Sequence, residues 1–492
     1  MLQTLFRLYS KKWTPKGYHL KALKFLIEHQ SGLLLLDPGL GKTSITLAAI
    51  AFLKKKGLIQ KVLIVAPIRV CQLVWPAERN KWKDFHGLSM VLLHGPDKEE
   101  LLQIPADIYL VNPEGLDWLL GVEKQMTKSG KQSIKPDRKR WKKFGFDTIV
   151  IDEISKFKHH GSGRFRALKQ VNDTLQRRWG LTGSPASNGL MGLFGICFIV
   201  DGGRTFGQFI SHYRRKYFHQ SYNGFGWELQ EDAEEKIYDR IAPLALRMAA
   251  EDYIKMPTLV PNYIKVKLPD KARRIYDEVW KDLIAEIDER VVTAANSGVR
   301  INKCRQIANG AIYLDPDVQA LLKLPTKNRE WVEVHDEKIK ALDDLIDSLQ
   351  GTPLFVAYDY GHDLERLLKK FGKDTPNIGS GVTAARAQDI ERQWNAGEIP
   401  LLLGHPQSVG HGLNLQNDKK HICWFSMIYD FELYDQFIRR IRRNGNKSGR
   451  VFVHHILAED TVDDDMLLAM SAKNKSQQEL FSALKKRAKM KY

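Results

Sequence analysis

The chain has 492 residues, more than one hydrophobic core usually organises, so two or three packed units are expected. Hydrophobic residues make up 43% and charged residues 27%, a balance that excludes a disordered chain, a collagen and a long coiled coil. The formal net charge of +18 is typical of proteins that bind a phosphate backbone, although a soluble basic protein without such a partner has the same balance.

No window reaches the roughly 18 apolar residues of a membrane span, and the start of the chain lacks a signal-peptide pattern. We therefore expect an intracellular, cytoplasmic protein without membrane partners. The cysteines are scattered singly, which predicts ordinary thiols and no structural zinc. They are Cys71, Cys197, Cys304 and Cys423.

In the first half, short apolar runs alternate with longer amphipathic stretches, the pattern of strands and helices in a parallel α/β sheet. Most runs are apolar throughout, as expected for strands covered on both faces. The predicted strands are Leu33–Leu36, Val62–Ala66, Met90–Leu93, Ile108–Asn112, Thr148–Ile151 and Trp179–Leu181.

The pattern returns after about residue 350, with predicted strands at Leu354–Tyr358, Leu401–Gly404, His421–Phe425 and Val451–Leu457. Residues 205–345 are richer in helix formers, including the charged stretch Lys271–Arg290. The predicted fold class is α/β, with two parallel-sheet lobes in tandem and helical insertions between them. We expect an N-terminal lobe at 1–250 with a helical insertion from about 205, a linker and helical insertion at 251–345, and a C-terminal lobe at 346–492.

The sharpest local signal is LLLLDPGLGKTS, a buried strand that runs into a glycine-rich turn and then a helix. Glycines let the backbone approach phosphate oxygens, a lysine neutralises their charge, and a hydroxyl after it can hold Mg²⁺. Leu36 stands where the eight-residue consensus has its first glycine, and a fortuitous turn before a helix is the alternative. The predicted nucleotide-binding residues here are Gly39, Leu40, Gly41, Lys42, Thr43 and Ser44.

A second element, FDTIVIDEISKFK, places Asp152 and Glu153 at the end of another apolar strand. Two acids there are costly unless they face a cation or a reacting water. In nucleotide-driven motors the first orders Mg²⁺ and the second polarises the attacking water, so we assign these roles to Asp152 and Glu153. A surface acidic turn is the alternative.

Near the C-terminus, YDQFIRRIRRNGNKSG places Gln436, Arg440 and Arg443 at helical spacing. One helix face would then present two guanidinium groups, which could act as arginine fingers on ATP bound by the first lobe. A solvated basic helix is the alternative.

In this order the motifs resemble those of the Swi/Snf-type ATPases of helicase superfamily two, especially the compact versions of bacteriophages and bacteria. The resemblance covers about 14–473. TPKGYHLKALKFL looks like the adenine-recognition segment, DPGLGKT like motif I, APIRVCQLVWPAERNKW like motif Ia and LVNPEGL like motif Ib. DEIS is similar to motif II, LTGSPASN to motif III, VAY to motif IV, HPQSVGHGLNLQ to motif V and residues 436–446 to motif VI.

The resemblance implies two RecA-like lobes that use ATP and Mg²⁺ and carry double-stranded or branched DNA across both lobes. It implies that His19 and Gln436 contact the nucleotide. It implies a coupling role for Thr182, Ser184, Gly412 and Asn414. It implies that the DNA track includes Arg69, Trp75, Asn112 and Ser408. We favour a monomer, located in the host cytoplasm if a phage encodes it.

Three residues depart from the family pattern. His19 replaces the adenine-reading glutamine, although an imidazole can still donate one hydrogen bond. Ser155 ends motif II where histidine is commoner, and Asn446 ends motif VI in place of glutamine. These changes bear on nucleotide preference and on coupling.

Other features have simpler interpretations. Lys124–Lys143 carries nine Lys or Arg and a possible stacking residue, Trp141, and is either a DNA-gripping insertion or a solvated loop. The tail LKKRAKMKY is either a DNA-trailing arm or a frayed end. The tryptophans Trp75, Trp82, Trp118 and Trp424 are expected to pack in cores or interfaces.

The function expected from all of this is an ATP-driven motor on duplex DNA, acting on forks, junctions or bound proteins in repair, recombination or replication. A strand-separating helicase is one alternative, although it needs a wedge that the sequence does not identify. A clamp that uses ATP only as a conformational switch is the alternative from another class.

Overall fold

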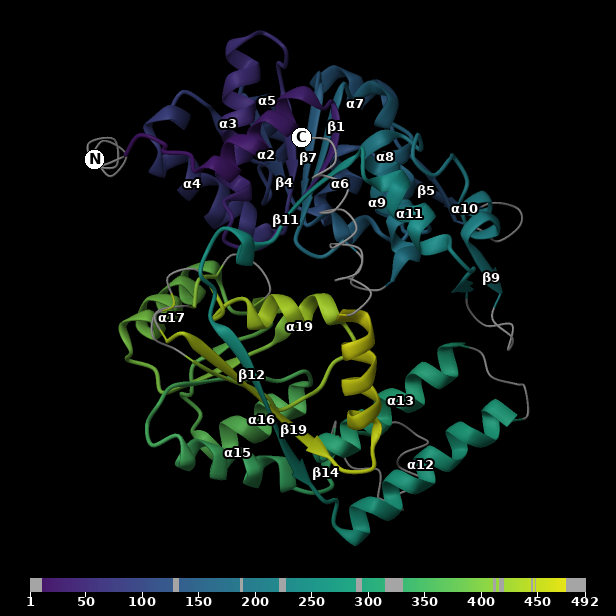
Figure 1. Cartoon of the computed structure of the whole chain (residues 1–492), viewed down its shortest axis with the longest axis vertical. Coiled ribbons are helices and arrows are strands. Elements are labelled where there is room, and N and C mark those ends of the chain that lie inside the picture. Colours follow the sequence, from purple (N-terminus) through teal and green to yellow (C-terminus); the bar gives the residue numbers. More distant parts are fainter. Residues whose placement is uncertain are drawn as a thin grey trace. The chain divides into compact units, whose positions relative to one another are not determined.

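The computed structural model of the chain describes residues 11–126, 132–185, 189–220, 227–288, 294–314, 331–409, 413–415, 420–443, 446 and 448–474. The chain divides into two compact units at the step from Lys255 to Met256. Each unit contains its own parallel sheet with helices packed against it (Figure 1). The predicted fold class, two RecA-like parallel-sheet lobes in tandem, is confirmed.

The first unit is built on a seven-stranded sheet in the order β11-β1-β8-β7-β2-β4-β3, with neighbouring strands parallel. The six strands predicted in this half are present, and β11 is an additional edge strand beside β1. The strands are β1 (Ser31–Leu36), β2 (Val62–Val65), β3 (Met90–Leu92), β4 (Ile108–Val111), β7 (Thr148–Asp152), β8 (Arg177–Thr182) and β11 (Ala245–Met248).

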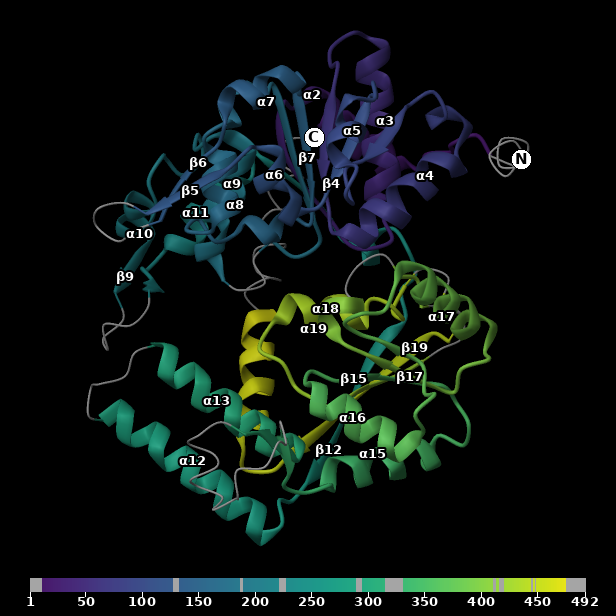
Figure 2. The ribbon, with the colours of Figure 1, turned by 180° about the vertical axis from the view of Figure 1, so that it is seen from behind.

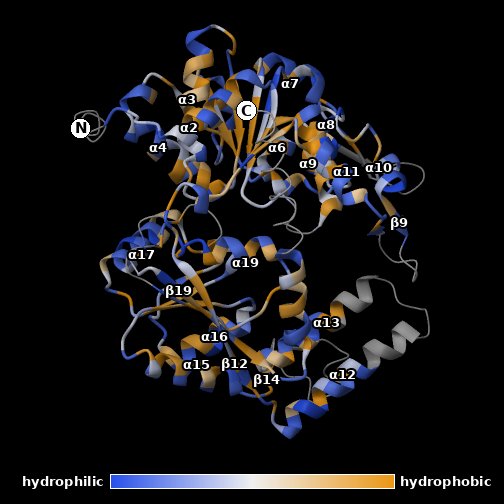
Figure 3. Cartoon of the chain, in the orientation of Figure 1, coloured by the Kyte–Doolittle hydropathy of each residue, from blue (hydrophilic) through white to orange (hydrophobic). Residues whose placement is uncertain are grey.

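Helices cover both faces of this sheet, which explains why its strands are apolar throughout. Leu33 and Leu35 face a core that includes α9, and their neighbours Leu34 and Leu36 are equally buried on the opposite face. In Figure 3 these strands are mostly orange, the colour of hydrophobic residues. The helices are α2 (Gly17–Glu28), α3 (Lys42–Lys55), α4 (Trp75–Lys81), α5 (Lys98–Gln103), α6 (Leu116–Leu119), α7 (Arg138–Phe144), α8 (Gly163–Lys169), α9 (Leu193–Asp201), α10 (Ile210–Tyr217) and α11 (Ala233–Ile241).

The basic stretch 124–143 is part of a small substructure. The first unit carries two short antiparallel hairpins. In one, β5 (Glu123–Met126) pairs with β6 (Gln132–Lys135), and in the other β9 (Phe218–Gln220) pairs with β10 (Trp227–Leu229). The first leads into α7, where Trp141 is 1% exposed and its Nε1 donates to Thr174 Oγ1 at 2.8 Å. Trp141 is therefore a packing residue, which corrects its interpretation as a stacking platform.

The second unit has a six-stranded parallel sheet in the order β12-β19-β18-β15-β17-β16. Its strands are β12 (Thr258–Val266), β15 (Leu354–Ala357), β16 (Asn377–Ile378), β17 (Leu401–Gly404), β18 (His421–Trp424) and β19 (Arg450–Ala458). Its helices are α12 (Asp270–Asp288), α13 (Ala294–Asn309), α15 (Glu337–Ser348), α16 (Gly361–Phe371), α17 (Ala384–Ala396), α18 (Pro406–Val409) and α19 (Phe431–Ile438). Residues 462–474 are also helical.

Separate cores cover the two faces of this sheet, one with α15 and α16 and one with α17 and α19. Figure 2 shows the helices from behind. The four cysteines are buried, as ordinary thiols should be. No helix in the described ranges is long and apolar enough to cross a membrane. The basic tail lies outside the described residues.

Strands β12 and β16 of this sheet were not predicted. Thr258–Val266 lies inside the region expected to hold a linker and helical insertion, yet it pairs in parallel with the whole of β19 (Figure 1). The signal is weak because β12 is an edge strand whose side chains are mostly exposed and which contains Pro261. Proline is tolerated at an edge because no second neighbour needs its missing N–H.

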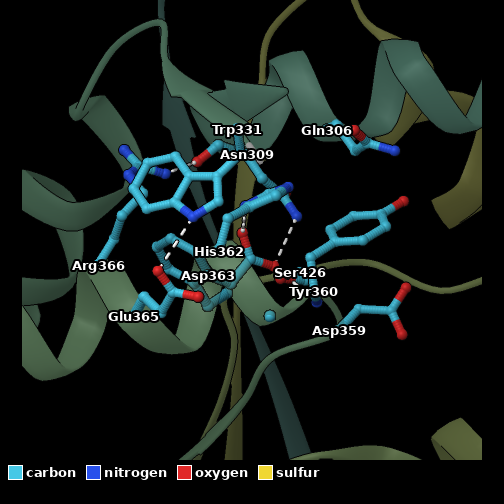
Figure 4. A network of polar contacts seen from close by, with 12 residues as sticks. Gln306, Asn309, Trp331, Asp359, Tyr360, His362, Asp363, Glu365, Arg366 and Ser426 are labelled. Atoms are coloured by element: carbon cyan, nitrogen blue, oxygen red, sulfur yellow. Dashed lines mark hydrogen bonds and ion pairs between the residues drawn. The ribbon is translucent and has the colours of Figure 1, made fainter. Parts of the chain in front are cut away.

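The helical hairpin of α12 and α13 is held to the second sheet through a buried polar network (Figure 4). Asp363 Oδ2 on α16 accepts from Ser426 Oγ at 2.6 Å and from Asn309 Nδ2 at 3.2 Å. Arg366 Nη1 donates to the Asn309 carbonyl at 2.8 Å. Because an unpaired partner would stay buried, these bonds are costly to break and fix the end of α13 on α16.

Candidate functional site

The glycine-rich loop of residues 37–41, here called the phosphate loop, joins β1 to α3 at the carboxyl edge of the first sheet. Gly39 and Gly41 have φ values of 89° and 77°, a left-handed backbone that side chains disfavour. A Cβ on Gly39 would meet nothing within 4 Å, whereas a Cβ on Gly41 would lie 3.0 Å from Ser44 Oγ. The glycines therefore allow the sharp turn and leave open backbone at Gly39.

Helix α3 begins at Lys42, directly after Gly41 as its N-cap. Lys42 folds back, and its Nζ donates to the Leu36 carbonyl at 2.8 Å. Ser44 Oγ donates to the Gly41 carbonyl at 3.0 Å, while Thr43 is half-buried beside it. The first-turn amides of a helix lack intrahelical acceptors, so this end of α3 favours an anion.

Asp152 and Glu153 lie at the carboxyl end of β7, on the same edge of the sheet. Asp152 is buried, and Oδ2 accepts from Trp75 Nε1 at 3.2 Å. Burial raises the pKa of Asp152 to about 6, the Glu153 charge adds to the rise, and the Lys42 ammonium opposes it. Such a desolvated carboxylate is a good ligand for a cation.

Glu153 adopts φ 58° and ψ 58°, a left-handed conformation that is rare for a residue with a side chain. Thr182 at the end of β8 donates its hydroxyl hydrogen to Glu153 Oε2 at 3.4 Å and accepts from the Ser184 N–H at 3.1 Å. Strained backbone of this kind gathers at functional sites. The bend directs Glu153 towards the segment 182–184.

Strand β8 lies between β1 and β7, so segment 182–184 connects the phosphate loop with the acidic pair. Thr182 is in register with Leu35 of β1, and a Cβ on Gly183 would lie 3.3 Å from Pro38 Cδ. The structure thus brings together the predicted residues of motifs I, II and III. The spacing of the motifs along the chain did not reveal that β8, which leads into motif III, lies between the strands that lead into motifs I and II.

His19 is attached to the phosphate loop from the start of α2. The Lys16 N–H donates to His19 Nδ1 at 3.0 Å, so the ring proton belongs on Nε2. His19 also hydrogen-bonds the backbone of Leu40, and a Cβ on Gly41 would lie 3.1 Å from Nε2. Burial lowers the pKa of His19, with a contribution from Lys16. The neutral ring therefore supports the loop.

These residues fit a nucleoside triphosphate with Mg²⁺. The loop supplies open backbone, helix amides and the Lys42 cation for phosphate oxygens. The Asp152 carboxylate and the Thr43 hydroxyl are oxygen groups of the kind that Mg²⁺ prefers. The raised pKa of Asp152 reflects a buried carboxyl that a nearby cation would stabilise as the anion.

The arginines of motif VI lie in the second unit, at the end of α19. That helix ends at Ile438, so Arg440 and Arg443 lie in the following turn. The prediction of a single helical face that carries both with Gln436 is therefore wrong. Gln436 itself is buried on α19, and its Nε2 donates to Glu432 Oε1 at 3.3 Å.

Both arginines bind the segment 413–415 of motif V instead. Arg440 Nη1 donates to the Leu413 carbonyl at 2.9 Å, and Arg443 Nη1 donates to Asn414 Oδ1 at 3.0 Å. Burial lowers the pKa of Arg443 to about 10, and the Glu391 carboxylate opposes this shift. Arg443 remains a cation at neutral pH. Asn414 is thus joined to Arg443, while Gly412 lies outside the described residues.

The predicted DNA-binding residues occupy separate places. Arg69 is half-buried before the π-helix Val70–Val74, and Asn112 follows β4 and donates to Glu114 Oε2 at 2.9 Å. Ser408 lies on α18 of the second unit. Trp75 is 0% exposed, and its indole N–H is directed to Asp152. Its burial leaves no surface for DNA, which corrects that prediction and agrees with the packing alternative.

Three residues of the site were missed. Asp37, the first residue of the phosphate loop, forms a buried ion pair with Arg247 of β11, with Oδ1 2.9 Å from Nη2. An acidic residue before a glycine-rich turn is an ordinary turn signal, so the sequence does not distinguish Asp37 from a turn residue. Arg247 lies in a short strand that the sequence did not reveal. Glu391 beside Arg443 was missed for a similar reason, since its role depends on packing.

A phosphate loop and an acidic pair at one edge of a parallel sheet, followed by a second parallel α/β unit, define a phosphate-loop nucleotide-binding protein with two RecA-like lobes. The SNF2-related domain family matches residues 7–320. The chain belongs to this family, whose members include helicase-like ATPases.

Relatives extend from phages to eukaryotes. Protein p41 of Acyrthosiphon pisum secondary endosymbiont phage 1 is 33% identical over 494 residues, which cover 97% of this chain and 100% of p41. Helicase domino of Drosophila melanogaster is 27% identical over 258 residues, 50% of this chain and 7% of that protein. The solved Sulfolobus solfataricus SWI2/SNF2 ATPase core in complex with dsDNA is 21% identical, with a TM-score of 0.41 over 94% of this chain and 92% of that one.

Proposed function

We propose that the chain is an ATP-dependent motor that translocates on double-stranded DNA and remodels forks, junctions or protein–DNA complexes. The observation that carries the proposal is the meeting of the phosphate loop, Asp152 and Glu153 at one sheet edge in a member of the SNF2-related family. A net charge of +18 supports a phosphate-backbone partner.

In this proposal the first unit binds the nucleotide and activates water. The amides at the start of α3 and the Lys42 ammonium hold the phosphates, and Thr43 and Asp152 hold Mg²⁺. Mg²⁺ supplies neutralisation of charge on the phosphate oxygens. Glu153 orients and polarises the attacking water, and its bond from Thr182 connects it to the segment 182–184.

The second unit contributes Arg440 and Arg443, which stabilise the charge that develops on the transferring phosphoryl group. Their bonds to Leu413 and Asn414 support a coupling role for motif V, because the arginines and that segment must move together. Arg69, Asn112 and Ser408 contact DNA phosphates. Such contacts hold any sequence, as a motor requires.

The test measures ATP turnover with single-stranded DNA, duplex, fork, four-way junction and RNA, each at low and high salt. We expect duplex or branched DNA to stimulate turnover about tenfold or more, with a steep loss at high salt. Glu153→Gln should abolish turnover with little effect on nucleotide affinity, because it retains shape but not charge.

Two outcomes distinguish the alternatives. Displacement of a strand from forked duplex would identify a helicase instead of a translocase on intact duplex. Turnover unchanged by every nucleic acid would contradict the motor and favour the ATP-switched clamp.

A further inference from the structure

The segment that leaves the first unit passes directly beside the phosphate loop. After β11 ends at Met248, the chain forms the 3₁₀ turn Ala250–Asp252 and reaches Lys255, the last residue before the second unit. In this turn the N–H groups of Tyr253 and Ile254 donate to the Ala250 carbonyl at 3.1 Å and 2.8 Å. Residues 249–254, here called the exit segment, are the covalent route from the nucleotide site to the second unit.

The first attachment of the exit segment is the buried carboxylate of Asp37. Oδ2 accepts from the Ala250 N–H at 2.9 Å, and Oδ1 pairs with Arg247 Nη2 at 2.9 Å. Arg247 Nη1 also donates to the carbonyls of Leu35 and Met248, at 3.1 Å and 2.8 Å. One carboxylate and one guanidinium thus join the end of β1, the phosphate loop and the exit segment.

The second attachment runs through the start of α2. His19 contacts the loop at Leu40 and Gly41, and its neighbour Tyr18 packs on Tyr253 with ring centroids 4.9 Å apart. Tyr18 is 8% exposed, whereas Tyr253 is 42% exposed. The exit segment is therefore tied to both ends of the phosphate loop, at Asp37 and at Leu40–Gly41.

Both attachments depend on the conformation of the loop. A bound phosphate would accept hydrogen bonds from the backbone around Gly39 and from Lys42. Lys42 here bonds to the Leu36 carbonyl, next to Asp37. A buried ion pair needs good geometry, and breaking it leaves an uncompensated buried charge. A shift of Asp37 should therefore be followed by Arg247 and by the N–H of Ala250.

Resting on the proposed function, we propose that Asp37, Arg247, Tyr18 and Tyr253 transmit nucleotide occupancy of the phosphate loop to the exit segment, and thereby to the connection with the second unit. These four are positioning residues, here called the exit clamp.

Hydrogen–deuterium exchange of the full chain, with and without Mg²⁺ and the ATP analogue adenylyl-imidodiphosphate, tests the exit clamp. In the parent protein the analogue should change exchange in the phosphate loop and, by about threefold or more, at Ala250, Tyr253 and Ile254. Asp37→Asn keeps an oxygen for the Ala250 N–H but loses the charge facing Arg247, and Arg247→Gln loses the opposite charge. Both should keep the loop response and lose that of the exit segment.

The matched control is Asp107→Asn, which breaks another ion pair of the first unit, 2.6 Å from Lys54, and should keep both responses. If Asp37→Asn fails to fold, Tyr253→Ala decides, because the Tyr253 side chain is 42% exposed. This variant should lose the response at the backbone amides of position 253 and of Ile254.

A parent whose loop responds while its exit segment does not would overturn the exit clamp alone, as would clamp variants with a full response. Absence of any response in the loop would instead overturn the proposed nucleotide site and this inference with it.

Discussion

The charge at Lys42 has a neutral hydrogen-bond partner, the Leu36 carbonyl, which a phosphate oxygen can replace. Lys42 is only half-buried, so its removal should not disturb packing. Lys42→Ala should lower ATP turnover about 100-fold or more, because a fixed cation at the phosphates stabilises the transition state. Phosphate-release assays check this. Lys55→Ala, an exposed lysine of the same helix, should have no effect, and retained turnover in Lys42→Ala would refute the assignment.

Arg443 differs from Lys42 in being firmly held, by Asn414 and by the carbonyl of Arg439. Arg443→Ala should lower kcat about 1,000-fold with nucleotide Kd changed less than about threefold, since a finger acts mainly in the transition state. Single-turnover kinetics and fluorescent-nucleotide titration separate the two quantities. Arg392→Ala, an exposed arginine of α17, is the control. A rise in Kd without loss of kcat would show that Arg443 only binds.

Trp75 and Trp141 show how burial decides the role of a residue. The family resemblance placed Trp75 on the DNA track, and Trp141 stands in a basic stretch, yet both are fully buried and donate their indole N–H to an internal acceptor. A tryptophan beside lysines has the same local sequence whether it stacks on a base or packs in a core. Only the fold decides whether the indole ring is buried or exposed.

At the scale of elements, β8 sets the distance between the phosphate loop and the acidic pair. Its centre is packed without room for a side chain at Gly180, where a Cβ would lie 2.5 Å from Ile154 Cδ1 and 2.8 Å from Leu33 Cδ2. These neighbours belong to the turn after β7 and to β1. Gly180 therefore allows the three elements to approach closely.

Gly180→Ala should lower the free energy of unfolding by roughly 1 to 3 kcal/mol, because an added methyl forces its neighbours apart. Urea denaturation measures the loss. Gly87→Ala is the matched control, since a Cβ there would meet nothing within 4 Å, and it should be neutral. An equal stability of the two variants would contradict the tight packing around β8.

For the molecule as a whole, pH dependence of folding should arise mainly in the second unit. Burial lowers the pKa of His335, His421, His454 and His455 to about 4. Asn262 Nδ2 donates to His454 Nδ1 at 2.9 Å, so His454 Nε2 carries the proton that faces His421 Nδ1 at 3.0 Å. Protonation of either acceptor nitrogen would break this chain of bonds across three strands.

In the unfolded chain these histidines titrate near 6.5, so on acidification they bind protons first in the unfolded state. Their contribution to stability is complete above about pH 6.5 and falls towards pH 4, by roughly 1 to 2 kcal/mol each at pH 5. Urea unfolding at pH 7.5 and pH 5 should show the loss. His454→Gln should reduce it, whereas His159→Gln, at an exposed position, should not. Equal stability at both pH values would contradict the burial of neutral imidazoles.

The sequence was sufficient for features that depend on neighbouring residues. A continuous apolar run such as Leu33–Leu36 can satisfy its backbone and hide both faces only in the middle of a covered sheet, so the strands were predictable. The phosphate loop needs two closely spaced glycines, a lysine and a hydroxyl, and these lie close together in the chain. Asp152 and Glu153 were predictable because two acids at the end of an apolar strand are costly unless they face a cation or a reacting water.

Features that depend on partners distant in the chain were decided only by the tertiary structure. Strand β12 needs β19 as its one neighbour, and its own residues look like a linker. The turn after Ile438 carries Arg440 and Arg443 to motif V, where helical spacing predicted one continuous face. Asp37 and Arg247 become an ion pair only when β11 joins β1. Hydrogen bonds and burial between such segments form when the sheet assembles, and the energy of that assembly outweighs any local preference.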